Sequence, residues 1–75
     1  MTTTARIHWD ANAGADAGWY CEVCDAEGQI FGNSQNVGTP DGPRRHDAGE
    51  RSLVRWGRAV ARACGAEGLV EVEIR

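Results

Sequence analysis

The chain contains no lysine, and all eight of its basic residues are arginine. With its many alanines and glycines, this composition is typical of a GC-rich genome, which by itself favours arginine. Long apolar runs are also missing, and none approaches the roughly 20 residues that span a bilayer. Residues 1–6 lack the apolar segment of a secretory signal. We therefore expect no membrane partner.

The chain contains three cysteines, an odd number. A disulfide framework is built from pairs and belongs to oxidising compartments. Without a secretion signal, three cysteines indicate a reducing compartment, so we expect the chain in the cytoplasm.

The length of 75 residues is also small. A chain of this size buries only about 60% of its unfolded surface, so its core is limited. That leaves little room for a pocket that encloses a substrate. We predict one small domain over residues 1–75, which binds a partner, holds no cofactor and is not an enzyme.

Residues 47–65 are the longest periodic segment and predict a helix. Asp47 is the expected N-cap, with Glu50 three residues later in a capping box. Gly65 is suited to the left-handed conformation that ends a helix. The apolar positions fall on one stripe, and we expect Gly57 there to mark the close approach of a strand or a large side chain. That stripe and its flanks are Leu53, Trp56, Gly57, Val60, Ala61 and Cys64.

Four arginines of this helix follow spacings of 4, 3 and 4, and they lie nearly opposite the apolar stripe. Like charges at this spacing repel one another, so a solvated face or a binding face are the two interpretations. Two more arginines directly before the helix extend the basic patch and favour binding. The predicted partner-binding residues are Arg44, Arg45, Arg51, Arg55, Arg58 and Arg62.

The remaining segments predict short strands and loops. Alternating or β-prone residues indicate strands at 5–9, 19–24, 29–35 and 69–75. We expect a frayed end at 1–4, a mobile loop at 10–18, a hairpin turn at 25–28 and an irregular loop at 36–46. The order β-β-β-α-β predicts an α+β fold, an antiparallel sheet with one amphipathic helix packed on one face.

Cys21 and Cys24 form a CxxC pair, the spacing of many zinc sites. On a strand, however, positions three apart point to opposite faces and cannot share a metal ion or a disulfide. No helix follows the pair, as a thioredoxin-like site requires. We interpret the cysteines as structural, so no metal site is expected. A small zinc-stabilised module through Cys21 and Cys24 stays as an alternative.

The net charge of −3 is unevenly distributed. Residues 1–43 carry −5, residues 44–62 carry +4 and residues 63–75 carry −2. Such a bipolar surface suits a protein partner or self-association at least as well as nucleic acid.

Several short runs resemble small orphan proteins encoded by actinobacterial phages, over roughly residues 5–43. The resemblance implies a phage accessory protein that acts inside a bacterial host, and it transfers no activity or functional residue. The runs are Ile7-His8-Trp9-Asp10, Gly18-Trp19-Tyr20, Asp25-Ala26-Glu27-Gly28, Val37-Gly38 and Pro40.

We predict a non-enzymatic interaction protein in the cytoplasm of the bacterial host. Its arginine-striped helix would bind a host protein with an acidic surface, or its acidic sheet face would bind a basic one. The alternative is a nucleic-acid-binding module that places the same arginines on phosphates. A homodimer through an edge strand is a further option, because a four-stranded sheet leaves two edges.

Overall fold

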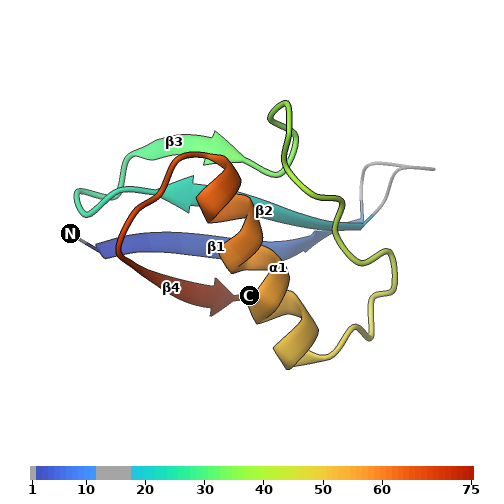
Figure 1. Cartoon of the computed structure of the whole chain (residues 1–75). Coiled ribbons are helices and arrows are strands. Elements are labelled where there is room, and N and C mark those ends of the chain that lie inside the picture. The colour runs from blue at the N-terminus through green and yellow to red at the C-terminus, as the bar shows by residue number, and fades with distance from the viewer. Residues whose placement is uncertain (1, 12–17) are drawn as a thin grey trace.

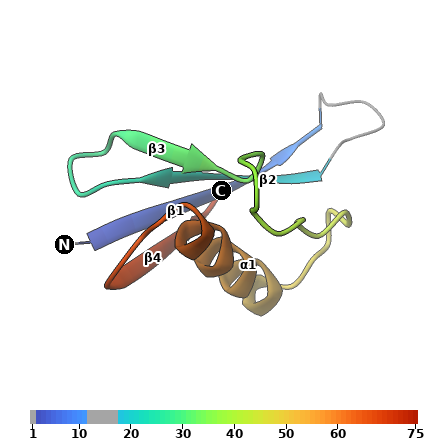
Figure 2. The ribbon, with the colours of Figure 1, turned by 45° about the horizontal axis from the view of Figure 1, so that its top comes forward.

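In the computed structural model, residues 2–11 and 18–75 are described. They form a four-stranded sheet with one helix across one of its faces (Figure 1). Seen from above, the other face of the sheet carries no helix (Figure 2). The elements are β1 (Thr2–Asp10), β2 (Gly18–Cys24), β3 (Ile30–Asn33), α1 (Glu50–Ala63) and β4 (Leu69–Ile74). The predicted α+β class is correct.

The strand order is β3-β2-β1-β4, and the sheet is mixed. β1 pairs antiparallel with β2, and β2 pairs antiparallel with β3. β4 instead runs parallel to β1, so the prediction of a fully antiparallel sheet was wrong. The physical reason is the crossover. α1 returns the chain to the end of the sheet where β3 begins, so β4 repeats the direction of β3 and β1.

The N-terminal strand is longer than its sequence predicted. Thr2–Thr4 do not form a frayed end, because they pair with Leu69–Glu71 of β4, and Thr3 is buried. β3 is shorter than expected and covers only Ile30–Asn33. The predicted loop at 36–46 contains no helix or strand. Most of the predicted mobile loop at 10–18 lies outside the described residues.

The predicted start of α1 was wrong. The helix begins at Glu50, and its N-cap is Gly49. No side chain forms a capping hydrogen bond there. Asp47 lies two residues before the N-cap, and Arg45 binds both of its carboxylate oxygens at 3.1 Å. The predicted end is correct. Gly65 has a φ of +96° and donates to Arg62 O, while the N–H of Ala66 donates to Ala61 O, which is a Schellman motif.

The core lies between α1 and the inner face of the sheet. The predicted stripe is buried except at its end, where Cys64 is half-buried. Gly57 occupies the closest contact: a Cβ added there would lie 2.8 Å from Ile7 Cδ1 and 3.4 Å from Val72 Cγ1. The helix therefore packs tightly on β1 and β4, as predicted for Gly57. The buried core residues are Ala5, Ile7, Cys21, Val23, Leu53, Trp56, Val60, Ala61, Ala66 and Val70.

Candidate functional site

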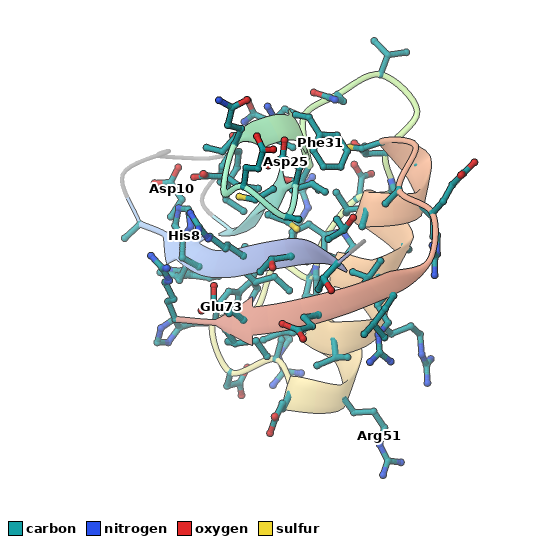
Figure 3. All side chains as sticks on the ribbon, turned by 90° about the vertical axis from the view of Figure 1, so that its left-hand side faces the viewer. His8, Asp10, Asp25, Phe31, Arg51 and Glu73 are labelled. Atoms are coloured by element: carbon teal, nitrogen blue, oxygen red, sulfur yellow. The ribbon has the colours of Figure 1, made fainter. Side chains whose placement is uncertain are left out.

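The outer side of α1 carries the strongest candidate site. Arg51, Arg55 and Arg58 are exposed and line a shallow groove together with Glu50 and Val54. In the part of the chain that the structure describes, none of these three arginines forms an ion pair or a side-chain hydrogen bond. Figure 3 shows Arg51 projecting from the helix, while His8 and Glu73 lie on the sheet. We call Arg51, Arg55 and Arg58 the arginine face.

The structure does not bring all six predicted arginines into one patch. Arg62 donates to Ala66 O at 3.1 Å and to Gly68 O at 2.7 Å, so it holds the turn that leads into β4. Arg45 forms an ion pair with Asp47. Arg44 is exposed but lines a different cavity, beside Trp19 and Trp56. Two of the predicted site residues therefore have structural partners within the chain.

An aromatic cluster that was not predicted from the sequence anchors the loop before the helix. His46 lies edge-on to Trp9, with ring centroids 4.9 Å apart, and stacks parallel to Trp19 at 6.1 Å. The indole N–H of Trp19 donates to Arg45 O at 2.8 Å. Trp19 itself was a sequence signal for this contact. The indole N–H of a half-buried Trp usually needs a hydrogen-bond acceptor, and a neighbouring loop offers backbone carbonyl groups.

A second indole anchors the same loop. Trp56 on α1 donates from Nε1 to Pro40 O at 3.0 Å, and Gly42 lies so close that an added Cβ would be 2.6 Å from the ring. The cavity beside these residues measures only about 190 Å³ and combines Asp41 with Arg44. It is smaller than the usual range for small-molecule sites. We assign it to loop packing.

The uncovered face of the sheet has a different chemistry. His8 and Tyr20 are cross-strand neighbours, with ring centroids 5.3 Å apart. Arg6 Nε lies 3.5 Å from Glu73 Oε2, and Arg75 lies 3.8 Å from the same oxygen. Partial burial, followed by the charge of Glu22, raises the pKa of Tyr20. This face carries Glu22, Glu71 and Glu73 against Arg6 and Arg75, so it is only slightly acidic.

The three cysteines are free thiols. Cys21 belongs to the core, and its burial, together with the neighbouring Cys64 and Cys24, raises the pKa of the Cys21 thiol to about 12. Cys24 is also fully buried but lies outside the core cluster. Among the described residues, no three His, Cys, Asp or Glu side chains are grouped as a metal site requires.

Comparison of the chain with protein-family models, with curated proteins and with solved structures found no match. Within the described residues, no helix is long and apolar enough to cross a membrane. The candidate function therefore depends on the residues themselves.

Proposed function

We propose that this chain is a small non-enzymatic interaction protein whose arginine face binds an acidic surface of a host protein. The observation that carries the proposal is that three arginines lie exposed on one helix side without any described partner. They repel one another in the free chain, and an acidic partner would remove that repulsion. The resemblance to actinobacterial phage proteins supports a phage accessory factor in the cytoplasm of a bacterial host.

Charge geometry favours a protein partner over nucleic acid. The arginine face runs from Arg51 to Arg58, a rise of about 10 Å along the helix. On duplex DNA three phosphate contacts give a salt slope of only about −2.7, which is weak for a binder. The acidic opposite face and the net charge of −3 repel a second stretch of nucleic acid. Trp19 offers a poor base-stacking surface as well, since His46 lies parallel to its ring.

The test is a pull-down from an actinobacterial lysate, treated with nuclease, in which three proteins are compared. These are the native chain, an Arg55→Glu, Arg58→Glu variant and an Arg44→Glu, Arg75→Glu control. Both variants change the net charge equally, but the control leaves the arginine face intact. We expect one host protein to be recovered at a constant ratio with the native chain and the control, and lost with the first variant.

Two outcomes would contradict this function. Recovery by the native chain only from a parallel lysate without nuclease, together with salt-sensitive binding of labelled DNA or RNA, would assign the arginine face to phosphates. Equal recovery by both variants would move the binding site away from α1. Circular dichroism of both variants should show the native fold, because the reversed side chains are exposed.

A further inference from the structure

The two edges of the sheet are protected very differently. β3 has only four residues, its pairing with β2 shifts register between Val23 and Cys24, and Gly32 lies against Cys64. β4 has six residues and pairs with β1 without a register shift. Bulges, proline and charged side chains are the usual means of blunting an edge. β4 has no bulge or proline, and its charged residues are Glu71 and Glu73, which lie on the uncovered face. Within the described chain it pairs only with β1.

The ladder shows which backbone groups of β4 remain open. The N–H of Arg75 donates to Ile7 O at 2.8 Å, so this amide points toward β1. Because amide directions alternate along a strand, the N–H and C=O groups of Val70, Val72 and Ile74 point away from β1. These three residues form a row of donors and acceptors at the sheet border.

The side chains of β4 alternate in the same regular way. Val70 and Val72 face the core, while Glu71 and Glu73 lie on the uncovered face. Leu69 is 63% exposed and Ile74 is 36% exposed, so both ends of the strand leave apolar surface for a neighbour. The edge thus presents a backbone ladder, one apolar side and one acidic side.

We propose that the open edge of β4 binds an extended segment of a partner protein that carries Lys or Arg at alternate positions, with apolar residues between them. In an added strand, side chains directly opposite lie about 5 Å apart, so basic residues would face Glu71 and Glu73. Glu71 has no described ion-pair partner, whereas Glu73 is shared by Arg6 and Arg75. Glu71 therefore contributes most of the charge complementarity.

A second copy of this chain fits the edge less well. Consider antiparallel pairings of β4 with itself that keep both apolar sides on one face. In the register centred on Val72, Glu71 of each copy lies opposite Glu73 of the other. In the register centred on Glu71, the two copies of Glu71 lie opposite each other. Other registers pair no more than three residues. Like charges directly opposite destabilise a strand pair, so a basic segment is favoured.

This site is separate from the arginine face. It needs a basic partner, whereas the arginine face needs an acidic one. The inference therefore does not depend on the proposed function. It concerns the backbone edge of β4 and not the outer side of α1.

The test titrates the ¹⁵N-labelled native chain with a short peptide of alternating lysine and valine. A peptide of alternating glutamate and valine serves as the control. We expect the lysine peptide to shift the amide signals of Val70, Val72 and Ile74 and to slow their hydrogen exchange. The glutamate peptide should not bind.

A matched pair of variants measures how much the charge of Glu71 contributes to the affinity for the lysine peptide. Glu71→Lys should weaken binding of the lysine peptide by about tenfold, because an attractive cross-strand pair becomes repulsive. Glu67→Lys makes the same charge change in the exposed turn before β4 and should leave binding unchanged. Ile74→Pro removes one outward N–H, so it should weaken peptide binding and reduce the slowed exchange at Val72.

Several results would overturn the inference. These are absence of binding, signal shifts confined to other surfaces, equal affinity in Glu71→Lys, and self-association through β4 that excludes the peptide. Because the amide map uses the native chain, it stays decisive even if a variant fails to fold.

Discussion

The two sides of α1 differ in what they contribute to the fold. The inner side carries Leu53 and Gly57, which fit against β1 and β4 with little free space. The outer side carries the arginine face, which is exposed and makes no described ion pair. Packing explains the inner residues completely and leaves the outer ones without a structural reason. A residue that costs repulsion and stabilises nothing is a candidate for binding.

The largest expected difference between the sides is in stability. Leu53→Ala should lower the free energy of unfolding by about 3 kcal/mol, since it removes buried apolar surface and leaves a cavity. Arg55→Ala, on the outer side of the same helix, should change it by less than about 0.5 kcal/mol. Urea denaturation of both variants measures the contrast. Comparable losses would mean that the outer side takes part in packing.

Alkaline pH should weaken the core beneath the inner side. The pKa of Cys21 rises from 9.0 to about 12 in the folded chain. Between these values the unfolded chain loses its proton while the folded chain keeps it, so stability falls as pH rises. The slope is at most about 1.4 kcal/mol per pH unit. The raised pKa of Tyr20 acts in the same direction.

Denaturant midpoints measured from neutral pH to about pH 11 test whether stability falls with pH because Cys21 is buried. Cys21→Ala should show a flatter profile, although its stability at neutral pH will be lower. An unchanged slope in the variant would assign the alkaline loss to other groups.

A smaller effect is expected at the border between the two sides, where Trp56 holds the preceding loop. Trp56→Phe keeps an aromatic ring but removes the hydrogen bond to Pro40 O. We expect a loss of about 1 kcal/mol. Amide exchange near residues 40–43 should become faster than in the native chain. Unchanged exchange there would show that the indole N–H does not anchor the loop.

The smallest effect on stability should come from the arginine face itself. Arg55→Gln with Arg58→Gln removes two like charges, so thermal stability at low salt should stay equal or rise slightly. A melting curve at low and moderate salt measures it. A clear loss of stability would show that these side chains support the fold and would weaken the case for binding.

The sequence predicted the parts of the fold that depend on local pattern. The stripe containing Leu53 and Val60, the terminating Gly65 and the alternation of β4 are all properties of neighbouring residues. The helix start was missed because the N-cap is Gly49, which has no side chain to signal it, while Asp47 pairs with Arg45. The parallel β4 was missed because direction depends on the crossover through α1 and not on the residues of the strand.

The candidate site was predicted only in part. Spacing identifies the side of the helix on which Arg51, Arg55 and Arg58 lie. It cannot show that the Arg62 side chain donates to Ala66 O and Gly68 O. These carbonyl oxygens come close to Arg62 only because the chain turns back at Gly65. The cluster of Trp9, Trp19 and His46 also joins residues far apart in sequence.

Site-specific photo-crosslinking in bacterial cells tests the central claim most directly. A photoreactive residue replaces Val54, in the groove of the arginine face, or Glu27, in the turn between β2 and β3. We predict that position 54 captures one host protein, that position 27 does not, and that Arg55→Glu with Arg58→Glu removes the product. Capture of nucleic acid alone at position 54, or no capture there, would contradict the claim that this face binds a protein.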